Sequence, residues 1–313
     1  MKVPRVLIVS VYYNRSSMVD ESIKSITEQL SENDFLLLVD DGSKDDTKVK
    51  LEKYITPNVK VVSYENQGFV NSIRRAIDSV DSEYIAVHGA GDLSLSGRFE
   101  KQAELLNSKP DVGLVGTWYH DIDIERNKST VIGKVLSFDN VEFMSRCNPF
   151  GHSTVMFRRS LYQKVGGYRS FFIFAQDRDL WCRISRHCKF AMIEEPLVLR
   201  YKSVGGSVSA DFKKSLKQRY LSDFAVYLHV NDYNDREDIS LEDASLIYRP
   251  SYELMKELFK RSVRASSERK VEILNYYRPH VLQGKGLIFY PYYLLQDYFP
   301  KFCRIISSIA NKK

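Results

Sequence analysis

Apolar runs of strand length alternate with helical patterns over the first ninety residues, and this alternation is what most limits the possible folds. The runs cover residues 5–13, 35–39, 59–63 and 84–88, and the first is rich in β-branched side chains. Between the first two, residues 19–30 repeat apolar side chains at helical spacing, with Ser16 and Ser17 as candidate N-caps. Helical segments near 45–54 and 69–80 follow in the same way. Strands that alternate with helices predict an α/β fold, a parallel sheet with helices on both faces.

Acidic turns close two of these predicted strands. Asp40-Asp41-Gly42-Ser43 follows the second, and Gly89-Ala90-Gly91-Asp92 follows the fourth. Ligands of open α/β sheets bind at the carboxyl ends of the strands, where loop side chains converge. Carboxylates there can accept a hydrogen bond from a nucleobase, hold a divalent cation against a diphosphate, or take a proton from an alcohol.

Several other function classes lack their signatures. The sequence has no GxGxxG after the first strand, no GxxxxGK[ST] and no GxSxG. Its four cysteines show no CxxC pairing, and no stretch approaches the ~18 apolar residues of a membrane-spanning helix. With 43% hydrophobic and 27% charged residues the composition is that of a globular protein. No signal peptide is recognised, so a cytoplasmic location is expected.

Seven sequence stretches follow one another in a characteristic order. They are VSVYYN (9–14), DESIKSI (20–26) with Gln29, LVDDGS (38–43), ENQG (65–68), YIA (84–86) with GAGD (89–92), GGY (166–168) and QDRDLW (176–181). Together they resemble the inverting family-2 glycosyltransferases of GT-A fold. The resemblance spans about residues 4–210, in the order and near the spacing of that family, and implies a Rossmann-like nucleotide-binding sheet flanked by helices.

The resemblance also implies roles for individual residues. Val11 and Asn14 would line the nucleotide pocket, and Asp41 would accept from the base of the nucleotide. The alternative for Asp41 is a turn residue that caps the following helix. Asp177 would be the catalytic base, its alternative being a helix N-terminal carboxylate favoured by the dipole. Asp179 is expected to support the acceptor side.

The metal motif departs from the family pattern, which is commonly DxDD. Gly89 and Gly91 stand where two acidic residues are usual, and only Asp92 remains. We expect Asp92 to bind the nucleotide-sugar and, with diphosphate oxygens, a Mg²⁺ or Mn²⁺ ion. The two glycines also support an alternative, a catalytically degraded relative that binds nucleotide or glycan as an assembly partner.

Three basic or imidazole side chains are further candidates for substrate contacts. His152 and Lys202 are placed on the acceptor or diphosphate side, Lys202 in a stretch where many relatives carry a histidine. Arg74 is placed near a phosphate of the nucleotide-sugar. The alternatives are a packed strand-edge histidine for His152 and a solvated helix face for Arg74. The segment 119–124 invites a metal interpretation, but an exposed continuation of a strand is the better prediction.

The region after residue 210 has a different character. We predict a helical C-terminal region, 211–313, after a GT-A domain of residues 1–210. Residues 256–313 hold twelve Lys/Arg and four Asp/Glu, a surplus of +8 in a chain whose net charge is +6. Seven of the sixteen residues in 287–302 are aromatic. This combination suits an anionic membrane surface, and packing on the fold or on a second subunit of a homo-oligomer is the alternative.

The predicted function is transfer of a sugar, with inversion, from a nucleotide-diphosphate donor. We expect a UDP-sugar as donor and a saccharide or lipid-linked saccharide as acceptor, in polysaccharide or glycan biosynthesis. The enzyme would be cytoplasmic or peripheral at the inner face of the cell membrane. Nucleic acid is not an expected partner, because the basic excess is confined to the tail.

Overall fold

The computed structural model describes residues 3–135, 140–201, 212–233 and a few residues between 240 and 248. The chain divides into two compact units, Met1–Ser207 and Val208–Lys313, and each is described here by itself.

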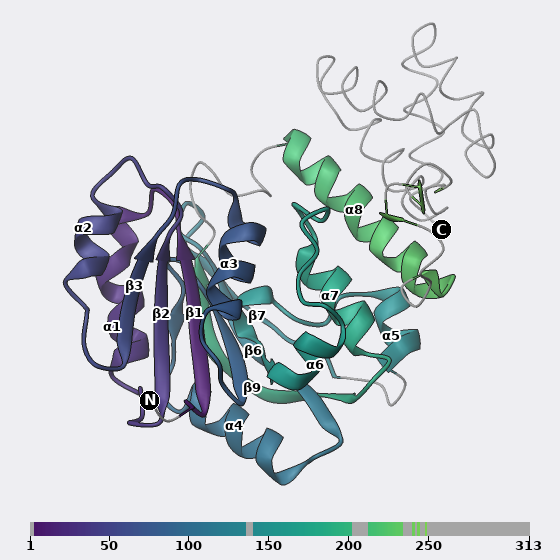
Figure 1. The fold of residues 1–313 in the computed structure, drawn as a ribbon, viewed down its shortest axis with the longest axis horizontal. Coiled ribbons are helices and arrows are strands. Elements are labelled where there is room, and N and C mark those ends of the chain that lie inside the picture. Colours follow the sequence, from purple (N-terminus) through teal and green to yellow (C-terminus); the bar gives the residue numbers. More distant parts are fainter. Residues whose placement is uncertain are drawn as a thin grey trace, which may run out of the picture. The chain divides into compact units, whose positions relative to one another are not determined.

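The first unit is built on one mixed sheet in the order β3-β2-β1-β4-β8-β6-β9-β5, with β7 paired to β6 (Figure 1). Pairing is parallel from β3 to β4, as predicted, whereas β8 runs antiparallel to both β4 and β6. The β6–β9 pair is parallel as well, so among the described strands the expectation of a parallel sheet fails only for β8, β5 and β7, which pair antiparallel to their neighbours. The strands are β1 (Val6–Tyr12), β2 (Asp34–Asp40), β3 (Val59–Ser63), β4 (Tyr84–Gly89), β5 (Leu93–Ser94), β6 (Val112–Asp123), β7 (Lys128–Ile132), β8 (Met156–Arg158) and β9 (Lys189–Tyr201).

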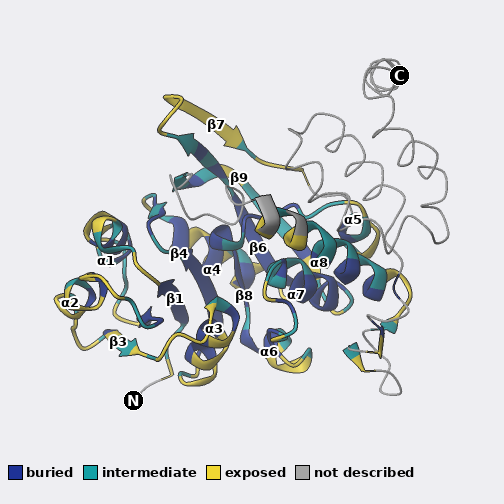
Figure 2. Cartoon of the chain, turned by 90° about the horizontal axis from the view of Figure 1, so that it is seen from above, coloured by how far each residue is buried: buried dark blue, intermediate teal, exposed yellow. Residues whose placement is uncertain are grey.

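Helices cover both faces of the sheet, which confirms the predicted layers (Figures 1 and 2). One core cluster joins one set of β1 side chains to helices α3, α6 and α7. The other joins the alternate β1 side chains to α1, α2 and α4. The helices of this unit are α1 (Val19–Thr27), α2 (Thr47–Glu52), α3 (Phe69–Asp78), α4 (Arg98–Ser108), α5 (Asn140–Arg146), α6 (Arg159–Lys164) and α7 (Gln176–Ile184), with short 3₁₀ turns at Ser16–Met18 and His152–Thr154.

Two local predictions change in the structure. Neither Ser16 nor Ser17 caps α1, because both lie in the 3₁₀ turn before it, and the N–H of Ser16 donates to Asp45 at 3.1 Å. The predicted strand in 119–124 is confirmed as the far part of β6, which pairs with β7, but its predicted exposure is wrong. Tyr119 and Asp121 are buried, and β7 is the exposed strand of the hairpin (Figure 2). Asp121 pairs with Arg200 at 2.8 Å.

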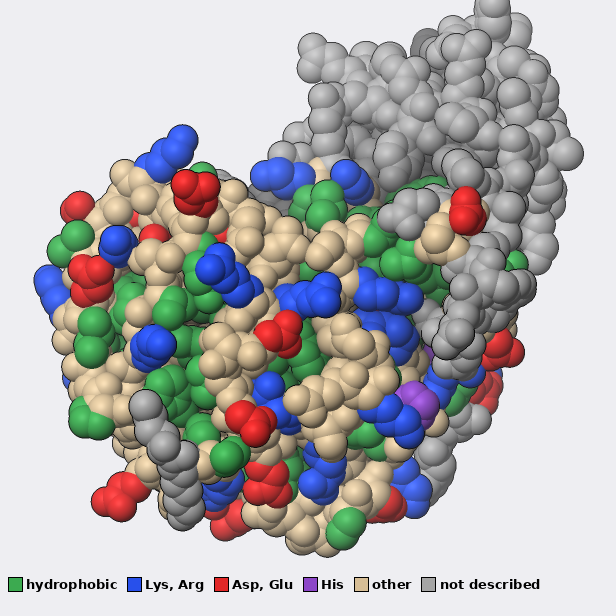
Figure 3. Space-filling view, viewed as in Figure 1, with side chains coloured by type: hydrophobic (Ala, Val, Ile, Leu, Met, Phe, Trp, Pro, Cys, Tyr) green, Lys and Arg blue, Asp and Glu red, His purple; other side chains and the backbone are tan. Residues whose placement is uncertain are grey.

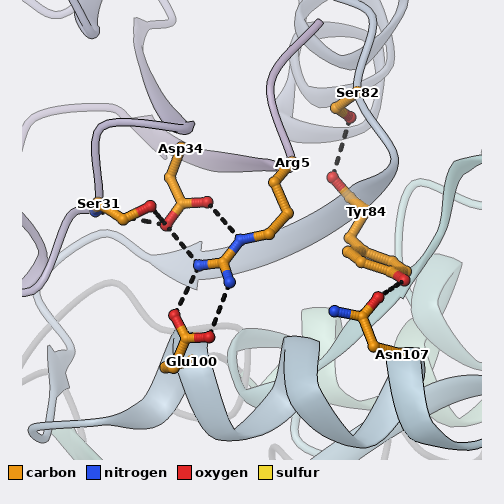
Figure 4. Close-up of polar contacts among 7 residues, drawn as sticks. All are labelled: Arg5, Ser31, Asp34, Ser82, Tyr84, Glu100 and Asn107. Carbon is orange, nitrogen blue, oxygen red and sulfur yellow. Dashed lines mark hydrogen bonds and ion pairs between the residues drawn. The ribbon is translucent and has the colours of Figure 1, made fainter.

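A cluster of hydrogen-bonded polar side chains links the amino ends of the strands (Figure 4). Arg5 donates to both oxygens of Asp34 at 3.2 Å and to both oxygens of Glu100 at 2.7 Å, which links β1, β2 and α4. Nearby, the Tyr84 hydroxyl donates to Asn107 at 2.5 Å and links β4 to the same helix. These contacts hold the sheet at the edge opposite the acidic turns.

The described part of the second unit consists mainly of α8 (Phe212–Val230). Phe224 and Tyr227 pack around the ring of Tyr248, whose hydroxyl donates to Asp223. None of the helices in the described part is both long and apolar enough to cross a membrane. The basic and aromatic segment 256–313 lies outside the described residues.

Candidate functional site

Three neighbouring parallel strands end at the same level and bring the predicted nucleotide residues to one edge. In the register of the sheet, Tyr12 of β1 lies opposite Asp40 of β2, and Val11 lies opposite Gly89 of β4. The loops after β1, β2 and β4 therefore begin side by side (Figure 1). This is the edge at which ligands of parallel sheets bind.

Asp41 is a buried carboxylate clamped by the start of α3. Only 3% of the residue is exposed, and its Oδ1 accepts the N–H of Gln67 at 3.1 Å and the hydroxyl of Ser72 at 2.5 Å. Its own N–H donates to the carbonyl of Tyr12 at 2.9 Å. Asp41 does not cap α2, because Asp45 accepts the N–H of Thr47 at the start of that helix. A carboxylate held in place by donors on one side is prepared to accept a further hydrogen bond.

Asn14 and Val11 lie at the end of β1, next to the turn that holds Asp41. Asn14 adopts a left-handed φ of +51°, donates its N–H to Ser43 at 3.0 Å and accepts the N–H of Lys44 at 2.8 Å. It therefore joins the loop after β1 to the turn after β2. Val11 is buried in the core below them.

Asp92 lies folded over the glycine that replaces the first acidic residue of the family motif. A Cβ on Gly89 would lie 2.3 Å from Asp92 Oδ2, so the place of this carboxylate requires glycine there. The residue is 8% exposed. Burial raises the pKa of the Asp92 carboxyl, against a hydrogen bond from Ser153 and the charge of Arg200.

A buried polar network holds the backbone of this loop. The carbonyl of Asp92 accepts from the Ser22 hydroxyl at 2.8 Å, and the N–H of Gly91 donates to the same hydroxyl at 3.2 Å. The ring of His88 contacts both the Ser22 hydroxyl and the Asp92 carbonyl, and its Nε2 lies 2.9 Å from the Asp92 carbonyl oxygen. Burial lowers the pKa of His88 to about 3, so the ring is neutral at physiological pH. The network fixes the loop through neutral groups, and the guanidinium of Arg98 lies 3.4 Å from the other ring nitrogen of His88.

A divalent cation fits this place only with the nucleotide supplying most of its ligands. Within the described ranges, no group of three or more His, Cys, Asp or Glu side chains is arranged to hold one. Asp92 contributes one carboxylate, beside glycines that permit close approach of a diphosphate. Magnesium is commonly held by one or two carboxylates together with substrate phosphates. The donor set fits a nucleotide-bound cation.

Asp177 lies in the first turn of α7, where the resemblance places the catalytic base. The turn follows Ala175, which adopts a left-handed φ of +56°. The side-chain amide of Asn148 donates to Asp177 Oδ2 at 2.9 Å. Trp181, one turn further along α7, is fully buried.

Asp179 lies within the core, out of reach of a substrate. Arg183 donates to its Oδ2 at 2.7 Å, and Arg169 pairs with its Oδ1. Burial alone would raise the pKa of the Asp179 carboxyl, but the two guanidinium groups outweigh it and lower that pKa. Arg183 also donates to the carbonyls of Val165 and Gly167. Asp179 therefore ties α7 to the turn before it and supports the site indirectly.

His152 lies in the short 3₁₀ turn before β8 and packs among aromatic side chains. Its Nε2 lies 2.7 Å from the Tyr168 hydroxyl, and its ring meets those of Phe69 and Tyr168 edge-on. Burial lowers the pKa of His152, although the charge of Asp177 opposes this. The structure thus favours the packed histidine of the two interpretations, with Phe69 linking it to the helix that clamps Asp41.

Arg74 is exposed on α3 and pairs with Asp78 at 3.8 Å. It lines an open surface pocket of about 470 Å³ together with Gln67, whose backbone contacts Asp41. Basic and acidic side chains are mixed over the face drawn in Figure 3. This position suits the predicted solvated face, next to the nucleotide edge. Lys202 lies outside the described residues.

Four contact residues were not assigned a role from the sequence: Gln67, Ser72, Asn148 and Ser153. Gln67 stands within a recognised motif, and Asn148 and Ser153 flank His152, but nothing in their spacing indicates a partner. Residues 148–153 contact two of the predicted site carboxylates, Asp177 through Asn148 and Asp92 through Ser153. The segment therefore connects the base and the loop after β4.

Comparison with known proteins agrees with this arrangement. A sequence model described as "Glycosyl transferase family 2" matches residues 7–166. The putative glycosyltransferase EpsE of Bacillus subtilis (strain 168) is 31% identical over 186 residues, which cover 58% of this chain and 66% of EpsE. The Escherichia coli protein named UDP-Glc:alpha-D-GlcNAc-diphosphoundecaprenol beta-1,3-glucosyltransferase WfgD is 24% identical, over 70% of this chain and 86% of its own length.

Solved glycosyltransferases share the fold. S. aureus TarS 1–349 in complex with UDP-GlcNAc has a TM-score of 0.54 at 12% identity, over 97% of this chain and 89% of that one. The mannosyltransferase PcManGT of Pyrobaculum calidifontis, in complex with GDP-Man and Mn²⁺, has a TM-score of 0.55 at 16% identity, over 100% and 89%. The predicted GT-A fold is confirmed.

Proposed function

We propose that this protein transfers a sugar, with inversion, from a UDP-sugar to a saccharide hydroxyl. The chain belongs to glycosyl transferase family 2 and is therefore a glycosyltransferase. The observation that carries this proposal is the run of contacts that joins the three site carboxylates. Asp41 is clamped by the start of α3, Phe69 of that helix packs on His152, and Asn148 of the same segment donates to Asp177. Ser153, the residue after His152, contacts Asp92.

Each of the three carboxylates has its own role in the proposed reaction. Asp41 accepts a hydrogen bond from the base of the nucleotide, and the loop 89–92 receives the diphosphate. Asp177 takes the proton of the acceptor hydroxyl as its oxygen attacks C1 of the sugar, on the face opposite the departing UDP. A carboxylate is a weak base, so much of the rate depends on the positions of the two substrates.

A lipid-linked saccharide is the acceptor we propose. WfgD and a second E. coli relative are named as transferases acting on GlcNAc-diphosphoundecaprenol. An enzyme with such an acceptor works at a membrane surface, and the basic and aromatic segment 256–313 suits that surface. We accordingly propose a catalytic domain of residues 1–210, and a C-terminal region that holds the enzyme at the inner face of the cell membrane.

The proposal is tested by incubating the full chain with a panel of nucleotide sugars and a GlcNAc-diphospholipid acceptor. Release of UDP with at least one UDP-sugar, dependent on the acceptor, is the expected result. If no donor gives acceptor-dependent release of a nucleoside diphosphate, the chain is better described as a degraded relative that binds nucleotide or glycan.

We expect Asp41→Asn to weaken the binding of UDP about 10-fold or more, because a hydrogen bond to a charged acceptor contributes ~1.5–3 kcal/mol. Asp41→Asn is a sharper variant than Asp41→Ala, because its amide oxygen still accepts from Ser72 and Gln67. Calorimetric titration with UDP measures the change, with the exposed Asp46→Asn as control. Wild-type affinity in Asp41→Asn would show that Asp41 only organises the turn.

Cation binding is expected to depend on the nucleotide. We propose that Asp92 and the diphosphate hold a Mg²⁺ or Mn²⁺ ion, which as a Lewis acid stabilises the leaving group. With one protein carboxylate, Mn²⁺ should bind about 10-fold or more tightly when UDP is present. Titration of Mn²⁺ with and without UDP measures this, and Asp92→Asn should abolish the difference. Full activity in excess EDTA would contradict the proposal.

A further inference from the structure

We propose that Asn148 is the positioning residue of the catalytic base: its side-chain amide holds one oxygen of Asp177 and leaves the other for the acceptor hydroxyl. This inference rests on the proposed function, in which Asp177 removes the proton of the acceptor. It assigns a specific task to a residue that the sequence motifs leave without one.

The amide of Asn148 is held at both of its ends. Its Nδ2 donates to Asp177 Oδ2 at 2.9 Å, and its Oδ1 accepts the N–H of Phe150 at 3.3 Å. Phe150 is itself anchored, because it is buried and packs edge-on against Phe190. An amide whose oxygen is occupied by a backbone donor presents its nitrogen in one direction only. The donor aimed at Asp177 is therefore fixed before any substrate binds.

The backbone beneath Asp177 is fixed separately. Asp179, two residues further along, is bound by Arg169 and Arg183 in the core, and Arg178 donates to the carbonyl of Met144 at 3.1 Å. These contacts place the first turn of α7 but do not reach the Asp177 carboxylate. The side chain of Asp177 still needs a partner to set its orientation, and Asn148 is that partner.

A neutral amide suits this position better than a charged group. A lysine or arginine here would form an ion pair with Asp177 and make the carboxylate a poorer proton acceptor. The titratable groups that interact with Asp177 include His152 and Tyr168. Burial lowers the pKa of His152 and raises the pKa of Tyr168, so both side chains are neutral. The Asn148 amide orients the base while leaving its charge in place.

The test compares Asn148→Ala and Asn148→Asp with wild type in steady-state kinetics over a range of pH. We expect Asn148→Ala to lower kcat by about 10- to 100-fold, because a misplaced catalytic group costs rate even when it is present. The KM for the donor should be unchanged. Asn148→Asp keeps the shape but brings a second carboxylate to Asp177, so the acid limb of the pH–rate profile should move upward by about one unit or more.

A matched control separates positioning from structure. Asn140, at the start of α5, donates its side-chain amide to the carbonyl of Cys188 at 2.9 Å. Asn140→Ala should leave the pH profile unchanged, whatever it does to the melting temperature. If Asn148→Ala retains kcat within about twofold and Asn148→Asp keeps the wild-type pH profile, the inference is overturned.

Asp177→Asn distinguishes the failure of this inference from failure of the proposed function. An inactive Asp177→Asn beside a normal Asn148→Ala would remove Asn148 from the mechanism and keep the base. A normal Asp177→Asn would remove the base itself, and with it the premise of the inference.

Discussion

Turnover is expected to fall by ~100-fold or more when Asp177 is replaced by asparagine, which keeps the shape of the side chain but removes its basicity. The affinity for the UDP-sugar should change little, because the nucleotide site that we propose lies at the ends of β1, β2 and β4, whereas Asp177 lies on α7. Single-turnover kinetics measures the chemical step, and calorimetry with UDP measures donor binding.

The control for this variant is Asp46→Asn, which makes the same chemical change on an exposed side chain. It should have wild-type turnover. If Asp177→Asn turns over at a near-normal rate, Asp177 is not the base, and its carboxylate serves only the N-terminus of α7.

The largest expected loss of stability follows from removing Asp179. In Asp179→Ala, Arg169 and Arg183 lose the buried carboxylate between them, and breaking one side of a buried ion pair costs about 3–5 kcal/mol. For a unit of this size we expect the melting temperature to fall by about 10 °C. Thermal unfolding followed by circular dichroism measures the effect.

An exposed ion pair provides the matched control. Lys24 and Glu28 lie 3.6 Å apart on α1 with side chains 71% and 65% exposed, so Glu28→Gln should cost no more than ~0.5 kcal/mol. A loss in Asp179→Ala no greater than that of Glu28→Gln would show that the buried ion pair contributes little.

The pH dependence of the Asp179 effect has a definite sign. The pKa of its carboxyl is lowered in the folded state, so its contribution is fully present above the unfolded value of ~3.9. That contribution disappears as the pH falls through the lower folded value. The stabilities of wild type and Asp179→Ala should therefore differ most near neutral pH and converge in strong acid.

The parallel half of the fold was predictable because its strands are marked by β-branched runs and its helices by apolar spacing. The strand at 59–63 was predicted with the bounds that β3 has. Helix α4 was not predicted, since Arg98 and Gln102 occupy its buried face and break the apolar pattern. Burial lowers the pKa of Arg98 to about 9, and its guanidinium donates to the carbonyl of Val87 at 2.8 Å.

The site was predictable only in part. Asp41 and Asp177 belong to short motifs, and those motifs are what mark them in the sequence. Their hydrogen-bond partners Ser72 and Asn148 stand 31 and 29 residues away in the chain. Contacts of this kind depend on tertiary packing, and no local pattern of residues predicts them.

The stereochemistry of transfer tests the central claim most directly. The product formed from an α-linked UDP-sugar is isolated, and the configuration of its new glycosidic bond is read from the coupling constant of the anomeric proton by NMR. Direct displacement at C1, with Asp177 as base, predicts a β-linked product. An α-linked product would contradict the account, because retention requires a reaction course other than a single displacement.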